Sequence, residues 1–361
     1  MQTFMSVWGY QMKFKLAVRQ ALLGATAIAT LVLPQAAHAD EGGVSFWLPG
    51  LFGILAAVPQ TPGFSLGSVY YHTTVGASGS VAASKEVQIG RLPTTVNVNL
   101  NANLNAQADL LLLVPTYTFG TPVLGGQLAV SMMTVFGRNS VGLNGTLTAG
   151  VGPFTTTQTG SLSDSLTGVG DLYPTVSLKW HDGVHNWMTY ATGDIPVGDY
   201  NSNRLANIGI GHGAIDGGGG YTYLNPMTGH EFSGVGGFTY NFRNPSTGVQ
   251  SGVDFHFDWG ASKFLSKQVF VGLVGYAYQQ ISDDTGPHPI QTGFRSRVLG
   301  LGPQIGYIFP VGSMQGYLNL KGYGEFDAAN RPSGWNTWLT FSISPAAPES
   351  TVTPTRHMIT K

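Results

Sequence analysis

Residues 96–110, VNVNLNANLNAQADL, alternate apolar and polar side chains without interruption. One parity carries the apolar set: Val96, Val98, Leu100, Ala102, Leu104, Ala106, Ala108 and Leu110. The other carries the polar set: Asn97, Asn99, Asn101, Asn103, Asn105, Gln107 and Asp109. A period of two is that of an extended strand with one apolar and one polar face. At about 3.4 Å per residue this strand spans on the order of 50 Å, which is long for a globular protein.

The N-terminus has the layout of an export signal. Lys13, Lys15 and Arg19 precede an apolar run over residues 21–33, and the small-x-small pattern AHA follows at 37–39. The run is too short to span a bilayer as a helix. We therefore predict a signal peptide over 1–39, with Met12 as an alternative true start, and an exported chain beginning at Asp40.

Composition narrows the class of protein further. Charged residues make up 10% of the chain, against roughly 25% in an average soluble domain, and aromatic residues make up 11%. Cysteine is absent, so no disulfide holds the exported chain. The net charge of −1 and the lack of a basic patch argue against nucleic acid as a partner. Low charge with many aromatic residues is typical of a transmembrane β-barrel and not of a disordered chain.

The rest of the chain consists of β-strand patterns separated by turns. The predicted strands are 64–76, 95–119, 126–136, 168–180, 187–193, 209–224, 230–241, 250–264, 269–281, 295–309, 314–326 and 336–344. Connections after odd-numbered strands are long, including 77–94 and 137–167, and connections after even-numbered strands are short. This alternation predicts an all-β, antiparallel, up-and-down transmembrane barrel of about twelve strands, with fourteen as the alternative and both termini in the periplasm.

Several strands separate an apolar from a polar face. DFHFDW sets Phe255, Phe257 and Trp259 against the polar set, and the strands at 171–180, 315–326 and 338–344 repeat the pattern. A Lys or Arg facing lipid at mid-bilayer costs about 2–4 kcal/mol, so polar side chains belong in the lumen. The predicted lumen set is Asp171, Lys179, Asp254, His256, Asp258, Lys321 and Glu325.

The same rule assigns the faces of the strand at 96–110. We expect its apolar face toward lipid or the barrel rim, its amides toward a hydrated interior, and residues 96–103 above the membrane in an extended rim. Leu111 and Leu113 share the parity of Asp109. Either a bulge swaps the faces there, or the two leucines point into the lumen as part of a solute path.

The chain resembles a known family through the segments GVGDLYPTVSLKW, ATGDIPVGDY, VGYAYQQISDDTG and GLGPQIGYIFP, and through FWLPGLFGILAAVPQTPGF at 46–64. This is the SphA-type or meta-pathway phenol degradation family of Gram-negative bacteria, and the likeness covers about residues 43–344. It implies an outer-membrane barrel similar to the FadL-type channels for hydrophobic solutes, with no catalytic residues. It also implies that residues 40–63 fold into the lumen as a plug; the alternative is a periplasmic or interfacial segment without a gating role. The plug residues are Trp47, Leu48, Leu51, Phe52, Ile54 and Leu55.

Two patterns that carry chemistry elsewhere are weak here. Asp254, His256 and Asp258 share one face, which permits a metal site, but one strand rarely closes such a site, so we predict a polar network with Lys179 and Lys321 and no metal or cofactor. GFSLG at 63–67 matches G-x-S-x-G, yet Ser65 opens a strand, whereas the hydrolase motif needs a strand–turn–helix context. Arg295 and Arg297 are placed to meet lipopolysaccharide phosphates at the outer rim.

The sequence as a whole predicts a monomeric outer-membrane channel, not an enzyme, for passive uptake of small hydrophobic or aromatic compounds. Its domains are the signal peptide, the plug-like segment 40–63, a barrel over 64–344 and a periplasmic tail over 345–361. The alternatives are a structural or adhesion-type barrel, for which plug substitutions leave uptake unchanged, and an outer-membrane lipid hydrolase, which a Ser-reactive probe labels. A soluble periplasmic β-protein is a weaker alternative.

Overall fold

The computed structural model describes residues 45–89, 92–151, 154–286 and 295–347. Within these ranges, side chains are described except at 79–89, 92–102, 147, 149–151 and 154. The predicted signal peptide, the start of the predicted plug and most of the C-terminal tail lie outside the described residues. Among the described residues, no helix is long and apolar enough to cross a membrane.

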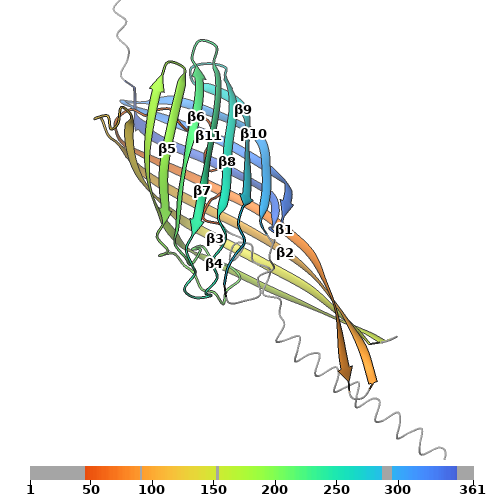
Figure 1. Ribbon diagram of the computed structural model, residues 1–361. Coiled ribbons are helices and arrows are strands. Elements are labelled where there is room, and N and C mark those ends of the chain that lie inside the picture. Colours follow the sequence, from red (N-terminus) through yellow and green to blue (C-terminus); the bar gives the residue numbers. More distant parts are fainter. Residues whose placement is uncertain (1–44, 90–91, 152–153, 287–294, 348–361) are drawn as a thin grey trace, which may run out of the picture. The chain divides into compact units, whose positions relative to one another are not determined.

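Twelve antiparallel strands close into a barrel, with β1 hydrogen-bonded to β12 (Figure 1). In chain order they are β1 (Gly63–Ile89), β2 (Leu92–Thr118), β3 (Gln127–Val151), β4 (Phe154–Asp182), β5 (His185–Asp194), β6 (Ala214–Asn225), β7 (His230–Asn241), β8 (Asp254–Phe264), β9 (Val269–Gln280), β10 (Arg297–Val311), β11 (Met314–Ala329) and β12 (Ser333–Pro345). Every strand pairs with its chain neighbours, which is the predicted up-and-down order. The twelve-strand prediction is confirmed.

The two ends of the barrel differ. At the turn end, β4 joins β5 and β10 joins β11 through tight turns in which Gly183 and Gly312 adopt positive φ of 62° and 60°. At the loop end, β5 joins β6 through residues 195–213 and β7 joins β8 through residues 242–253. The N-terminal strand starts, and the C-terminal strand finishes, at the turn end.

The first four strands continue well beyond the loop end of the others (Figure 1). The pairing of β1 with β12 stops at Gly76–Ser333, and that of β4 with β5 stops at Thr175–Thr192, while β1 to β4 stay paired with one another. We call residues 77–89, 92–104, 143–151 and 154–162 the strand extension. Residues 77–94 and 137–167 were predicted as loops, and this was wrong, because their backbone groups pair across the four strands instead.

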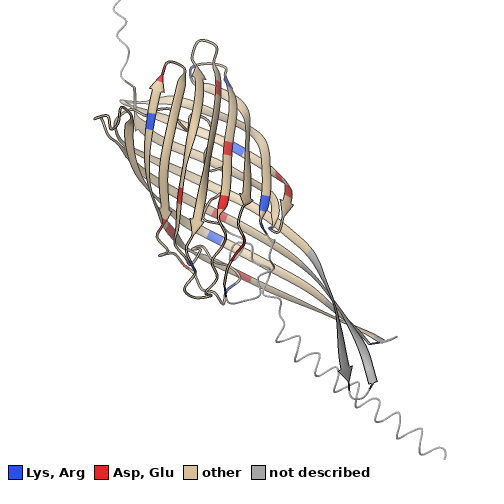
Figure 2. Ribbon diagram, in the orientation of Figure 1, with Lys and Arg blue, Asp and Glu red and all other residues tan. Residues whose placement is uncertain are grey.

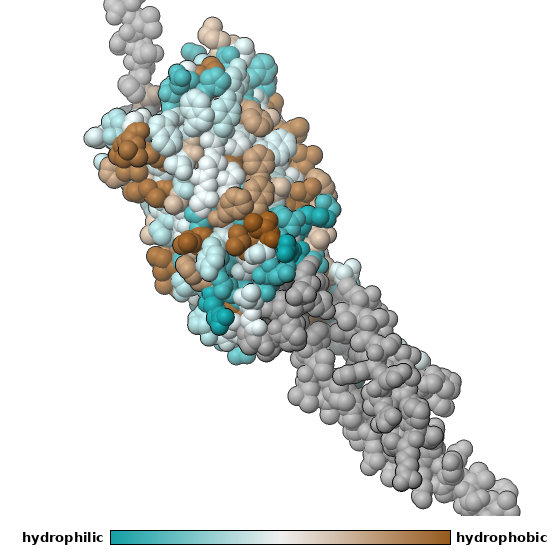
Figure 3. Space-filling view, in the orientation of Figure 1, coloured by the Kyte–Doolittle hydropathy of each residue, from teal (hydrophilic) through white to brown (hydrophobic). Residues whose placement is uncertain are grey.

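The outer face of the barrel is apolar and nearly free of charge. Figure 2 shows that most of the wall carries neither sign, and Figure 3 shows apolar residues gathered over the middle of the visible face. Leu320 is 48% exposed, while its chain neighbours Asn319 and Lys321 are buried, and Phe341 of β12 is 40% exposed. The predicted outward faces of β8, β11 and β12 therefore hold, and a wall of this kind suits a lipid bilayer.

The predicted faces of the strand at 96–110 were wrong wherever its side chains are described. Asn103, Asn105 and Gln107 are exposed on the outside, whereas Leu104, Ala106 and Ala108 lie on the inner face, in line with the fully buried Leu112. The pairing of β1 with β2 runs without a register shift, so no bulge swaps the faces. These amides lie beyond the apolar part of the outer wall.

Candidate functional site

Residues 45–62, which we call the luminal segment, lie inside the barrel. Trp47 is 3% exposed and Ala57 is fully buried. They belong to one buried cluster with inward side chains from around the wall: Tyr71, Leu112, Val135, Tyr173, Met188, Tyr190, Ala214, Val235, Val274, Tyr276, Tyr278, Val298, Tyr323 and Trp338. The predicted plug residues Leu48, Leu51 and Phe52 pack against this cluster, and Ile54 is 8% exposed. The lumen at this level is therefore filled by an apolar, largely aromatic core.

Trp47 stacks on a buried polar pair of the wall. Its ring lies 3.6 Å from the His256 ring, centroid to centroid, at an interplanar angle of 13°. His256 Nε2 lies 2.9 Å from an Asp216 carboxylate oxygen that also accepts a hydrogen bond from Thr239. Both side chains of this hydrogen-bonded pair are fully buried. The pair fixes the imidazole as a flat platform, because its ring nitrogen is anchored to the neighbouring wall.

Asp258 holds the backbone of the luminal segment. Its two carboxylate oxygens accept hydrogen bonds from the Gly50 and Phe52 N–H groups, at 2.8 Å and 3.1 Å. Asp258 is 1% exposed, so the carboxylate has exchanged water for these two donors. Hydrogen bonds to a charged group contribute about 1.5–3 kcal/mol each, and more is lost when a buried charge is left unpaired.

Two inward lysines, the buried Lys321 and the half-buried Lys179, hold the same segment through its carbonyl groups. Lys321 Nζ donates to the carbonyl oxygens of Gly50 and Phe52, the latter at 3.1 Å, and Lys179 Nζ donates to Val58 at 3.3 Å. We expected these lysines to pair with carboxylates. In the described part of the chain neither forms an ion pair, because backbone carbonyls of the luminal segment take their place.

Two further contacts of this kind were not predicted from the sequence. Glu231 accepts a hydrogen bond from the Leu55 N–H at 2.9 Å, and Thr222 accepts one from the Ala57 N–H at 3.1 Å. Leu55 has a positive φ of 61°, which turns the segment toward these acceptors. Glu231 lies in the pattern HEFSG, which reads as an ordinary strand, and only the barrel closure brings it to the segment.

The remaining residues of the predicted lumen set also face inward but hold loops and wall residues. Asp171 accepts the N–H groups of Gly198 and Ile210, both in the β5–β6 loop, at 2.7 Å and 2.8 Å. Asp254 accepts from Asn241 at 2.9 Å. Glu325 accepts the Tyr276 hydroxyl and the Gly334 N–H, both at 2.8 Å. The predicted set therefore divides into groups that bind the luminal segment and groups that shape the loop end.

Leu111 and Leu113 do not lie in the lumen, and their assignment to the solute path was wrong. Leu111 is 40% exposed and is opposite Tyr70 and Phe136, which are also exposed on the outer wall. Asp109 lies on the same outer face, where its carboxylate accepts from the Tyr70 hydroxyl at 2.6 Å and contacts His72 at 2.7 Å. Local hydrogen bonding, not the lumen, satisfies this carboxylate.

The predicted rim arginines are exposed at the loop end and already paired. Arg295 Nε donates to Asp283, and Arg297 Nη2 donates to Asp327, at 2.8 Å and 2.9 Å. Contact of these arginines with lipopolysaccharide stays a prediction. Among the described residues, no group of three or more His, Asp or Glu side chains is placed to hold a metal ion. Ser65 lies within β1 opposite Thr116.

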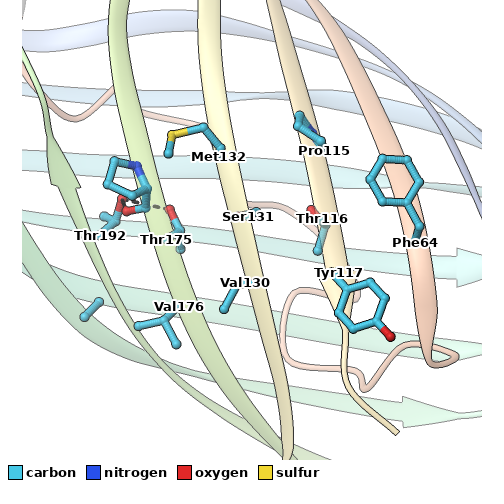
Figure 4. A pocket seen from close by; sticks show the side chains of 12 residues that line it. Phe64, Pro115, Thr116, Tyr117, Val130, Ser131, Met132, Thr175, Val176 and Thr192 are labelled. Carbon is cyan, nitrogen blue, oxygen red and sulfur yellow. Dashed lines mark hydrogen bonds between the residues drawn. The ribbon is translucent and has the colours of Figure 1, made fainter.

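Figure 4 shows a depression of the wall across β1 to β5. Phe64, Tyr117, Val130 and Val176 line it and are 40–58% exposed, which places the depression on the outer side of the barrel. Pro115 and Pro174 lie within it, and a proline cannot donate to the strand ladder. It is separate from the luminal segment, so it is no part of the candidate site.

A closed antiparallel barrel with an apolar outer wall and a filled, polar-anchored lumen defines an outer-membrane type of β-barrel. The chain belongs to the family described as "Putative MetA-pathway of phenol degradation", whose profile matches residues 64–341. Among solved structures, an outer membrane channel from Pseudomonas putida F1 is similar in fold, with a TM-score of 0.58 at 14% identity over 79% of this chain and 97% of that one. A FadL homologue from Pseudomonas aeruginosa covers 85% of this chain and 96% of its own at 8% identity, and its TM-score of 0.39 supports no further argument. No curated protein matches the chain.

Proposed function

We propose that the protein is an outer-membrane channel, and not an enzyme, for passive uptake of small hydrophobic or aromatic compounds. In this proposal the turn end faces the periplasm, the strand extension stands outside the cell, and the luminal segment is the plug of a monomeric channel. Membership of the phenol-degradation family and the channel-like fold support the proposal.

One observation carries it: a largely apolar inner face leads from the strand extension to the luminal segment. The register sets Ala77, Leu104, Leu143 and Leu162 side by side, and below them Val75, Ala106 and Val141. Ala108 and Leu166 continue the row inward, with Thr73 and Asn139 beside them. Leu110 with Tyr71, and then Leu112 with Val69, follow. From Ala77 to Val69 this face runs about 27 Å at about 3.4 Å per residue.

This face ends at the aromatic core around Trp47. Leu112 and Tyr71 belong to the same buried cluster as Phe46 and Trp47. The polar residues on this face are satisfied: the Asp164 carboxylate accepts the N–H groups of Leu205 and Ala206, Asn139 donates to the Asn207 carbonyl, and Thr73 donates to the Trp335 carbonyl. An apolar solute that leaves water on the extension therefore finds apolar side chains at every level of the path.

The mechanism follows from how the luminal segment is held. A solute is captured on the inner face of the extension, is desolvated there, and reaches the aromatic core by replacing contacts of Trp47 and Phe52. Because Asp258, Lys321, Lys179 and Glu231 hold the segment only by hydrogen bonds, the segment can move without unfolding a strand. The solute then leaves at the turn end.

The test is influx of a radiolabelled aromatic compound into liposomes that contain the purified full-length chain or a variant lacking residues 46–58. A faster-migrating band in an unboiled detergent gel must first show that both barrels are folded. We expect the wild type to conduct the solute and the deletion to conduct it faster and with less selectivity against ions.

The control is a variant with a deletion of similar length in the C-terminal tail, over residues 349–361, which should leave influx unchanged. Influx through neither folded barrel would contradict the channel and favour a structural or adhesion-type role. Labelling by a serine-reactive probe would instead favour a lipid hydrolase.

A further inference from the structure

The β11–β12 loop directs one arginine into the barrel. Asp327 and Asn330 adopt positive φ of 51° and 57°, and the Asn330 side chain donates to the Arg295 carbonyl at 2.9 Å. This turn places the Arg331 guanidinium over the inward ring of Tyr278, with 4.9 Å between the guanidinium carbon and the ring centroid. Arg331 is thus a cation at the loop end of the lumen.

The guanidinium of Arg331 lacks the partners that a buried charge ordinarily has. Its Nε and Nη1 atoms are buried and have no hydrogen-bond acceptor. In the described part of the chain it forms no ion pair, unlike Arg295 and Arg297 on the same rim. A cation–π contact offsets only part of the cost of removing two N–H donors from water. These donors are therefore available to an acceptor that the chain does not supply.

Nearby carboxylates do not fill this role because other donors already engage them. Glu325 accepts the Tyr276 hydroxyl and the Gly334 N–H, and Asp216 is paired with His256 and Thr239. Neither carboxylate forms an ion pair with Arg331.

Tyr278 and His256 are neighbours across the β8–β9 pair, so their rings form adjacent parts of one platform. Each is covered by a residue from a different element: Arg331 of the loop lies over Tyr278, and Trp47 of the luminal segment lies on His256. Opposed residues in antiparallel strands lie about 5 Å apart, which is within the length of one aromatic acid.

The geometry points to a binding site for an aromatic anion, a carboxylate or phenolate, formed by Arg331 and the Tyr278–His256 platform. This inference rests on the proposed channel function and names its solute class. The ring of the solute takes the place of Trp47 on His256, and its anionic oxygens accept the N–H groups of Arg331. Replacement of Trp47 also couples binding to release of the luminal segment, because that ring is the segment's stacked contact with the wall.

The test is equilibrium dialysis of the folded full-length protein in detergent against radiolabelled benzoate and against benzamide, its neutral isostere. We expect the wild type to bind benzoate more tightly than benzamide. Arg331→Gln should lower the affinity for benzoate by about tenfold, as the loss of one charge-assisted contact predicts, and should leave the affinity for benzamide unchanged. Arg331→Lys, which keeps the charge but not the planar fork, should retain part of the preference.

The matched control is Arg138→Gln, which removes a cation from the exposed outer face opposite Asp109. It should leave both affinities unchanged. Equal binding of benzoate and benzamide by the wild type, or an equal loss of both in Arg331→Gln, would overturn the anion site while leaving the channel intact. Binding of neither compound by the folded wild type, together with no aromatic influx into liposomes, would overturn the site and the channel together.

Discussion

At Asp258 a single buried carboxylate accepts two consecutive anchoring bonds, from Gly50 and Phe52, while Lys321 donates to carbonyls of the same turn. Asp258 therefore binds the N–H groups, and Lys321 the carbonyl groups, of one short stretch of the luminal segment. Each such charge-assisted bond contributes about 1.5–3 kcal/mol, which is enough to decide whether the luminal segment stays in place.

The first prediction concerns this pair. Asp258→Asn sets an amide N–H against a backbone N–H, and Lys321→Met removes the donor altogether. Each variant should weaken the hold on the luminal segment, raising the open fraction by about tenfold for every 1.4 kcal/mol lost. Conductance of single barrels in planar lipid bilayers measures this fraction. Lys267→Met, an exposed change at the turn end, is the control, and conductance equal to the wild type in both lumen variants would contradict the clamp.

The second prediction concerns Gly237. Because Gly237 has no side chain, Tyr190 and His256 can contact each other beside it. A Cβ atom there would lie 2.3 Å from the Tyr190 hydroxyl and 2.9 Å from the His256 ring. Gly237→Ala should displace the platform on which Trp47 stacks, at an overpacking cost of about 1–3 kcal/mol. The temperature at which the folded gel band converts to the unfolded one should fall.

Gly324→Ala is the matched change for this measurement, because a Cβ at Gly324 meets nothing within 4 Å. That variant should convert at the wild-type temperature. Equal conversion temperatures for both alanine variants would show that Tyr190 and His256 relax without cost.

The two faces of the strand extension differ in their side chains and in what they contact. Its inner leucines continue the lumen wall, and its outer amides and hydroxyls meet the surroundings of the barrel. Exposed apolar side chains on a solvated sheet have a cost that a purely structural extension would avoid. Leu162, at 56% exposed, is the clearest example.

The third prediction tests this division. Replacing Leu104 and Leu162 with Ser should raise the concentration of aromatic solute needed for half-maximal influx several-fold, because about 25 cal/mol is lost per Å² of apolar contact. Asn103→Ser and Asn144→Ser change the opposite face of the extension, in β2 and β3, and should have no effect. A similar loss in both pairs would indicate damage to the sheet and not to a solute path.

The extension also shows where sequence reasoning reached its limit. The strand count and the faces of β8, β11 and β12 follow from strict alternation within a lipid belt. The face of residues 103–110 does not, because the lipid rule was applied above the belt. The alternation along the strand could have given the correct face. Asn103, Asn105 and Gln107 share the parity of Leu111 and Leu113, so the amide face is the outer face. Glu231 and Arg331 carried no local signal, since only closure and a turn bring them to the lumen.

At the scale of the whole molecule, the barrel is closed by the pairing of β1 with β12, which we call the seam. β1 and β12 pair from Leu66–Ile343 to Gly76–Ser333, and Tyr71 packs on Trp338 with ring centroids 4.5 Å apart. No free strand edge remains along this height, which is what keeps a barrel compact in detergent.

The fourth prediction follows from the seam. Unboiled protein should migrate faster than boiled protein, and removal of residues 79–102, with Ser78 and Asn103 joined by a short turn, should leave that difference intact. The trimmed chain keeps every β1–β12 pair, so folding should survive while capture at low solute concentration falls. Loss of the fast band on trimming would mean that the extension is needed for assembly.

The wall side chains that hold the luminal segment form hydrogen bonds with its peptide groups. Every residue except proline has the same N–H and C=O groups. These hydrogen bonds therefore do not depend on which side chains the segment has. Substitutions at Leu51 or Phe52 can alter the side chains that the aromatic core presents while these backbone hydrogen bonds stay as they are. In the proposed channel, such an arrangement lets the solute preference change one side chain at a time without a change in how the segment is held.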